Sequence, residues 1–99
     1  MELTVTTEVA NWYNEELFAQ KPIKYVRFFP RYGGFSEHIP GFSIGISNDV
    51  PDTPLVVVEK EDITFFIESN DHWYFEGVHL DVILNETLEE PEFVIKKEK

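Results

Sequence analysis

Apolar and polar residues change their spacing near residue 22, and this change separates one helix from a series of strands. Residues 3–5 alternate briefly, as in a short strand. The next apolar residues recur at helical spacing and predict one buried stripe, made of Val9, Trp12, Tyr13 and Leu17. We expect Thr6 or Thr7 to cap this helix and Pro22 to end it near residue 20.

After residue 22 the alternation has a period of two, in short runs bounded by glycine, proline and acidic residues. It predicts strands over residues 24–32, 42–47, 55–60, 63–68, 78–84 and 93–95. Glu61 and Asp62 are expected to form a hairpin turn. Ser43, Gly45 and Ser47 make a face of small residues, over which a bulky side chain can pack.

Two segments between these runs do not alternate. Residues 69–77 predict a compact connector with one helical turn, capped by Ser69 or Asn70, and residues 85–91 predict an acidic loop. One N-terminal helix followed by short strands predicts a mainly β (α+β) fold. The 99 residues, of which 42% are hydrophobic and 15% aromatic, are enough for a single domain, residues 1–99, with one modest core.

The formal net charge of −11 makes this an acidic protein, and it disfavours nucleic acid and anionic membrane surfaces as partners. Residues 17–36 are the exception, because they contain basic residues and no acid. Within them, Arg27 and Arg31 are expected to form ion pairs with acidic neighbours in the folded chain. The alternative for these two residues is an anion site.

The chain contains no cysteine. This cysteine-free composition excludes disulfides, thiolate catalysis and metal or iron–sulfur sites held by cysteine. The N-terminal segment is acidic and amphipathic, unlike a signal peptide, and no run approaches the roughly 18 apolar residues of a membrane span. We expect a cytoplasmic protein with no cofactor.

Four sequence motifs are long enough to indicate a family. They are the stretches from Arg27 to Gly34, from Pro40 to Ser47, from Ile63 to Phe75 and from Glu90 to Phe93. The chain resembles the HesB/IscA-like domains of iron–sulfur cluster biogenesis, in particular a short subgroup from Gram-positive bacteria. The resemblance is strongest over residues 2–84, and residues 85–99 form an acidic and then lysine-rich tail. It implies a compact mixed β-sandwich or barrel of five to seven short strands with one N-terminal helix.

The resemblance also shows what this chain lacks. In the family, three cysteines hold the cluster or iron, but here the loop cysteine position is Phe35 and the C-terminal pair falls within residues 88–93. The resemblance therefore implies the fold without the cluster ligands. We expect a non-enzymatic binding or accessory protein, monomeric or homodimeric, with a protein partner of open identity. The alternatives are a small metal carrier that uses carboxylates and His79, and an enzyme on the same scaffold.

The glycine-rich stretch from residue 31 to residue 46 contains two candidate sites. Residues 41–45 match the G-x-S-x-G pattern, but a catalytic Ser43 needs a strand-to-helix turn and an α/β-hydrolase sheet that this chain is too short to build. The glycine pair before it is expected to present a binding loop. That loop consists of Gly33, Gly34, Phe35, Ser36, Glu37 and His38.

Two more candidate sites lie nearer the C-terminus. His79 and Asp81 are two residues apart on a predicted strand, so both can face one metal ion, although adventitious binding is the simpler expectation. Trp73, Tyr74 and Phe75 are three consecutive aromatic residues that cannot all point inward. They form either a partner surface or a cover over the open end of the core.

Overall fold

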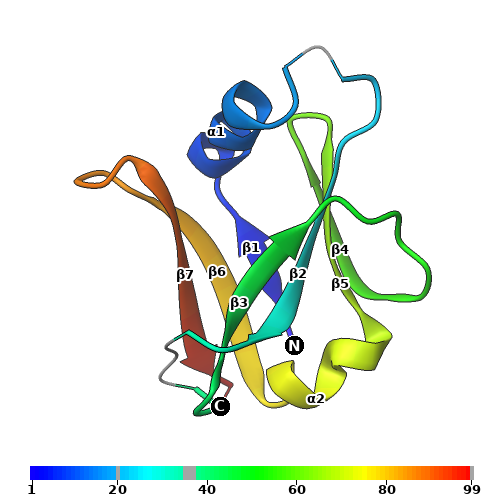
Figure 1. The fold of residues 1–99 in the computed structure, drawn as a ribbon, viewed down its shortest axis with the longest axis vertical. Helices are drawn as coiled ribbons and strands as arrows, with labels where there is room; N and C mark the ends of the chain where they lie inside the picture. Colours follow the sequence, from blue (N-terminus) through cyan, green and yellow to red (C-terminus); the bar gives the residue numbers. More distant parts are fainter. Residues whose placement is uncertain (20, 35–37, 99) are drawn as a thin grey trace.

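Two β-sheets and two short helices make up the fold in the computed structural model, which describes residues 1–19, 21–34 and 38–98 (Figure 1). The elements are β1 (Leu3–Val5), α1 (Thr7–Glu16), β2 (Tyr25–Tyr32), β3 (Phe42–Ser47), β4 (Pro54–Lys60), β5 (Ile63–Glu68), a 3-10 turn η1 (Ser69–Asp71), α2 (His72–Phe75), β6 (Val78–Asn85) and β7 (Glu90–Lys97). The predicted mainly β fold with an N-terminal helix is confirmed, with α2 as a short addition.

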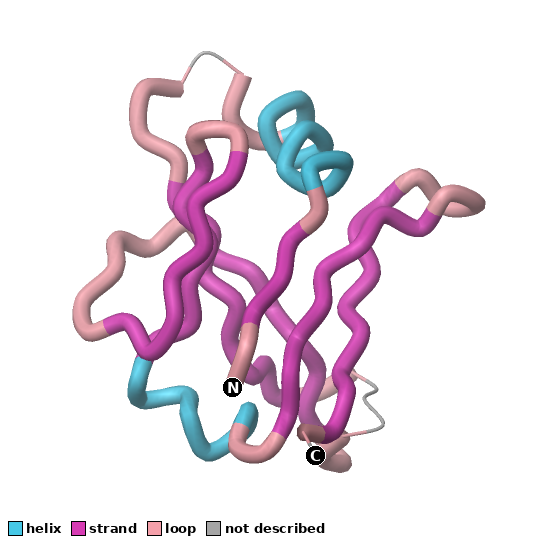
Figure 2. The backbone as a smooth tube through the Cα atoms, turned by 180° about the vertical axis from the view of Figure 1, so that it is seen from behind, coloured by secondary structure: helices cyan, strands magenta, loops and turns pink. Residues whose placement is uncertain are grey.

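The sheets have the strand orders β1-β6-β7 and β3-β2-β5-β4. Most neighbouring strands are antiparallel, but β1 pairs with β6 and β2 pairs with β5 in parallel. β1 also lies against β4, so these two outer strands bring the sheets together on one side (Figure 2). β3 and β7 are left as the outer strands on the other side.

The core lies between the two sheets and under α1. Phe28 of β2 stacks on Phe65 of β5 with ring centroids 5.9 Å apart, and it meets Phe93 of β7 edge-on at 5.6 Å. Tyr13 of α1 covers Phe65 from the helix side, at 5.7 Å. Aromatic rings from three layers thus close one core, as the aromatic content predicts.

Helix α1 begins as predicted and ends earlier than predicted. Thr6 is the N-cap, and its Oγ1 accepts a hydrogen bond from the Val9 amide at 3.3 Å. The helix stops at Glu16, and Phe18 turns into the core while Leu17 stays 38% exposed. The assignment of Leu17 to the buried stripe was wrong because burying the larger Phe18 ring stabilises the fold more than continuing the helix.

The C-terminal part is more regular than its composition predicts. β7 runs from Glu90 to Lys97, and β6 extends to Asn85, so the acidic loop is limited to residues 86–89. The error arose because Glu90 and Glu92 point to solvent and Pro91 lies on an outer strand, where strands tolerate both. Asn85 Oδ1 closes the turn by accepting hydrogen bonds from the Thr87 and Leu88 amides.

Two other local predictions have different outcomes. Neither Ser69 nor Asn70 caps the connector: Glu68 and Asp71 hold the N-cap positions, without a side-chain capping bond. The small face of β3 is confirmed, because a Cβ at Gly45 would lie only 2.7 Å from Cζ of Phe29 on β2. Among the described residues, no helix is long and apolar enough to cross a membrane.

Candidate functional site

The connection between β2 and β3 begins with the glycine pair. Gly33 and Gly34 have φ angles of 101° and 74°, which favour glycine, and Gly33 N–H donates to the Gly41 carbonyl at 2.7 Å. The prediction that the pair ends the strand is therefore confirmed. Phe35, Ser36 and Glu37 of the predicted binding loop lie outside the described residues, so the binding loop stays a prediction.

His38 ties the far end of this connection to α2. Its Nε2 lies 2.5 Å from the carbonyl oxygen of Tyr74, and its ring meets the Tyr74 ring edge-on at 5.1 Å. The contact holds the start of the described segment before β3 against α2.

Ser43 lies within β3 and supports the same connection. Its hydroxyl donates to the Gly33 carbonyl at 3.1 Å and lies 3.4 Å from Nε of Arg31. The chain continues as a strand to Ser47 instead of turning into a helix. The geometry of a nucleophile elbow is therefore absent at Ser43, as expected from the sequence.

Three aromatic residues at the end of the β2–β3 ladder and on α2 form what we call the aromatic surface: Tyr32, Phe42 and Trp73. Phe42 lies in the middle, with its ring edge-on to Tyr32 at 5.8 Å and to Trp73 at 5.3 Å. Tyr32 is 86% exposed and Trp73 is 50% exposed. Exposed rings held by a partly buried neighbour are suited to bury area against another protein with little loss of side-chain entropy.

The structure changes the membership of the predicted aromatic site. Tyr74 and Phe75 are fully buried and belong to the core, so Trp73 is the one member of that triplet on this surface. Sequence reasoning missed Tyr32 and Phe42. The signal that could have found them is the hairpin register, which pairs Tyr32 with Phe42 directly before the glycine-rich connection.

Arg27 forms an internal ion-pair cluster on the outer side of the same sheet. Its guanidinium lies 2.8 Å from Asp71 and 3.3 Å from Asp49, and it also lies over the Phe29 ring. The hydrogen bond to Asp71 is the main cause that raises the pKa of Arg27. Two carboxylates already neutralise this cation, which fits the ion-pair interpretation of Arg27 better than an anion site.

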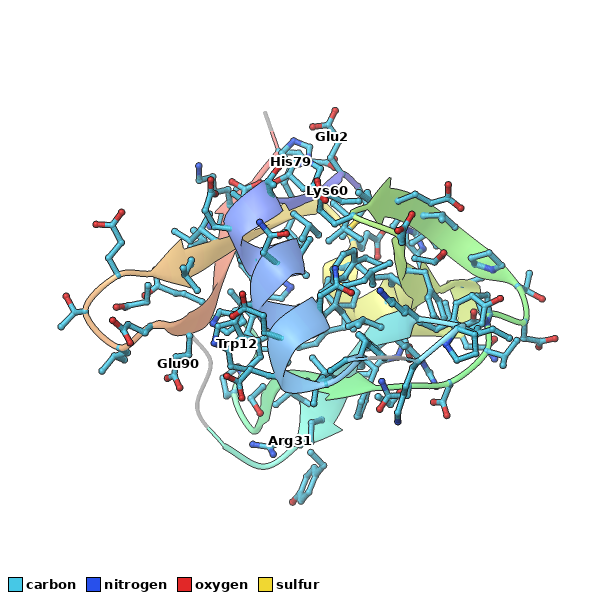
Figure 3. All side chains as sticks on the ribbon, turned by 90° about the horizontal axis from the view of Figure 1, so that it is seen from above. Glu2, Trp12, Arg31, Lys60, His79 and Glu90 are labelled. Carbon is cyan, nitrogen blue, oxygen red and sulfur yellow. The ribbon has the colours of Figure 1, made fainter. Side chains whose placement is uncertain are left out.

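Arg31 lies further along the strand and is exposed. Figure 3 shows it on the opposite side of the molecule from Glu2 and His79. Among the described residues its guanidinium donates a hydrogen bond to Ser43, and the anion-site interpretation of Arg31 stays a prediction.

His79 and Asp81 share one face of β6, but each is engaged by its own chain. The Glu2 amide donates to Nδ1 of His79 at 3.1 Å, and Asp81 accepts from Thr4 at 2.5 Å and from Lys96 at 3.0 Å. These contacts lower the pKa of Asp81, with the Thr4 hydrogen bond as the largest cause. The described residues include no group of three metal-ligating side chains.

The chain is similar over nearly its whole length to several bacterial proteins. It is 44% identical over 93 residues to the Bacillus subtilis (strain 168) protein named pyruvate dehydrogenase inhibitor, which covers 94% of this chain and 97% of that protein. It is 30% identical over 98 residues to an uncharacterized Staphylococcus saprophyticus protein, which covers 97% and 100% of the two chains. No protein-family model matches the chain.

Among solved structures, IscA with the [2Fe-2S] cluster is similar, with a TM-score of 0.55 over 96% of this chain and 84% of that chain. The sequence identity is 14%, so this similarity shows the fold alone. It confirms the IscA-like fold expected from the sequence. The Bacillus relative is named for the inhibition of an enzyme, and its name does not refer to cluster biogenesis.

Proposed function

Because the chain belongs to the same family as the Bacillus subtilis protein named pyruvate dehydrogenase inhibitor, we propose that it is a non-catalytic protein that inhibits a pyruvate dehydrogenase by binding to it. The similarity extends over 94% of this chain and 97% of that protein, so it is not limited to one part of the fold. The inhibitor acts through protein contact and needs no iron–sulfur cluster, since the chain has no cysteine to hold one.

The aromatic surface is the structural observation that carries this proposal. Tyr32 is 86% exposed, so its ring contributes little to the core. Trp73 is 50% exposed and contacts the same Phe42 ring. Tyrosine and tryptophan are enriched among the residues that dominate protein–protein binding energy. A rigid anchor of this kind supports a binding protein more directly than it supports an enzyme.

The test is inhibition of the purified pyruvate dehydrogenase complex of Bacillus subtilis, measured as the rate of NADH formation with increasing amounts of this chain. Direct binding is measured in parallel by biolayer interferometry. We expect Trp73→Ala and Tyr32→Ala each to weaken inhibition about tenfold or more, as loss of an aromatic anchor usually does.

Leu88→Ala is the matched control, because Leu88 is a large exposed side chain in the β6–β7 turn, at the other end of the molecule (Figure 1). It should inhibit like the unchanged chain. If the unchanged chain neither binds the complex nor slows it, the proposed function is wrong. If it inhibits and all three variants inhibit equally, the function stands and the aromatic surface is the wrong site.

A further inference from the structure

The sheet β3-β2-β5-β4 has two outer strands that differ in how they are covered. β4 lies against β1, whereas β3 pairs with no second strand among the described residues. β3 reads FSIGIS and contains no charged residue and no proline. β7, the outer strand of the other sheet, contains both: Glu90, Pro91, Glu92, Lys96 and Lys97.

Charges and proline on an outer strand are the usual means of preventing another chain from pairing with it. β7 therefore has this protection and β3 lacks it. An unprotected outer strand is a liability in a free protein, and it is also the feature that strand addition by a partner requires.

The register shows which backbone groups of β3 point away from β2. Gly33 and Gly41 are joined by a ladder hydrogen bond, and successive pairs in an antiparallel ladder alternate in bonding. Counting from this pair, Ser43, Gly45 and Ser47 bond to β2, whereas Ile44 and Ile46 direct their amides and carbonyls outward. Pro30 lies opposite Ile44, where no amide hydrogen is needed toward β3.

The side chains beside these outward groups are apolar. Ile46 is 41% exposed, Ile44 is half-buried against the core, and Phe42 continues the same row into the aromatic surface. If another strand paired with β3, every second side chain of that strand would lie beside the row formed by Phe42, Ile44 and Ile46. The end of the added strand next to Phe42 would also lie near Trp73.

We propose that an extended segment of the inhibited enzyme adds to β3 as a further antiparallel or parallel strand, with apolar side chains on the Ile44–Ile46 row and basic residues beside them. This inference rests on the proposed function. The charge argues for a basic segment of another protein over a second copy: the chain carries −11, so a second copy is repelled and a basic segment is attracted. Arg27 does not repel a basic segment, because Asp49 and Asp71 neutralise its charge. Arg31 reduces the attraction of the acidic chain for a basic segment only near its own position.

Hydrogen–deuterium exchange of the intact chain, alone and with the Bacillus subtilis pyruvate dehydrogenase complex, tests strand addition directly. We expect the amides of Ile44 and Ile46 to exchange at least about tenfold more slowly in the complex, because each gains a ladder hydrogen bond. The amide of Ser43 should change less, since it is already bonded to β2 in the free chain. Higher salt should weaken binding.

Variants provide the second measurement. Ile44→Pro removes an outward amide, and Ile46→Lys places a charge on the unprotected edge, so each should weaken binding about tenfold. Leu88→Lys is the control for Ile46→Lys, because it also replaces an exposed aliphatic side chain with lysine. Leu88 is 65% exposed and lies in the β6–β7 turn, so this variant should bind like the unchanged chain. Circular dichroism identifies any variant that fails to fold, and the exchange measurement does not depend on a variant.

Each result has a distinct meaning. Inhibition with no protection at Ile44 and Ile46 overturns strand addition and leaves the proposed function in place. Protection that increases with concentration of the chain alone assigns the edge to a second copy and overturns the partner assignment. Failure of the unchanged chain to bind the complex at all overturns both proposals.

Discussion

The two ends of β2 show how one strand can both build the core and present an exposed aromatic ring. Val26 and Phe28 near its start are almost completely buried, whereas Tyr32 at its end is 86% exposed. At its start β2 pairs with β5, it has partners on both sides at Arg27, and Phe28 also meets Phe93 of the other sheet. At its end β2 pairs only with β3. The coverage of the strand, more than its residue types, decides whether an aromatic ring stabilises the fold or stays available for a partner.

Phe28→Ala should have the largest effect on stability. It removes a buried ring that contacts both Phe65 and Phe93, so we expect the free energy of unfolding to fall by about 3–5 kcal/mol. Urea denaturation followed by circular dichroism measures this change. Tyr32→Ala, the matched substitution at the exposed end, should change the free energy of unfolding by no more than about 0.5 kcal/mol. Equal losses at the two ends would contradict the comparison.

Gly45→Ala tests the middle of the same ladder. The added Cβ would lie 2.7 Å from the ring of Phe29, which must move to make room. We expect a loss of about 1–3 kcal/mol in the free energy of unfolding, as overpacking usually causes. The change is measured by urea denaturation, with Ser47→Ala on the same face of β3 as its control. A Gly45→Ala variant as stable as the unchanged chain would show that the Phe29 ring is not closely packed there.

Asp81→Asn should have a smaller effect than Gly45→Ala, and one that depends on pH. Asp81 has a lowered pKa in the folded chain, so its ionised form stabilises the fold fully above the unfolded pKa of about 4. That contribution is lost as the pH falls through the lower folded pKa. At pH 7 the variant should lose less than about 1 kcal/mol, and its stability should fall less steeply below about pH 4 than that of the unchanged chain. Thermal unfolding across pH measures both, and identical pH profiles would contradict the assignment.

Local sequence patterns predicted most of the elements, because alternation and capping act over a few residues. The Thr6 cap, the β4–β5 hairpin at Glu61 and Asp62, and the small face of β3 around Gly45 are all visible in short stretches of sequence. The helix end was missed because Phe18 is drawn inward by a core that other segments build. β7 was predicted too short, since only its pairing with β6 shows that its acids face solvent.

The candidate site could be predicted from the sequence to a lesser degree than the helices and strands. The sequence by itself determined that the chain is acidic, lacks cysteine ligands and has an aromatic triplet at residues 73–75. Only the folded chain decided that Trp73 faces out while Tyr74 and Phe75 are buried, and that Trp73 meets Phe42 and, through it, Tyr32. The reason is physical: exposure and the meeting of distant residues are set by which sheets and helices cover each position, and no short stretch of sequence contains that information.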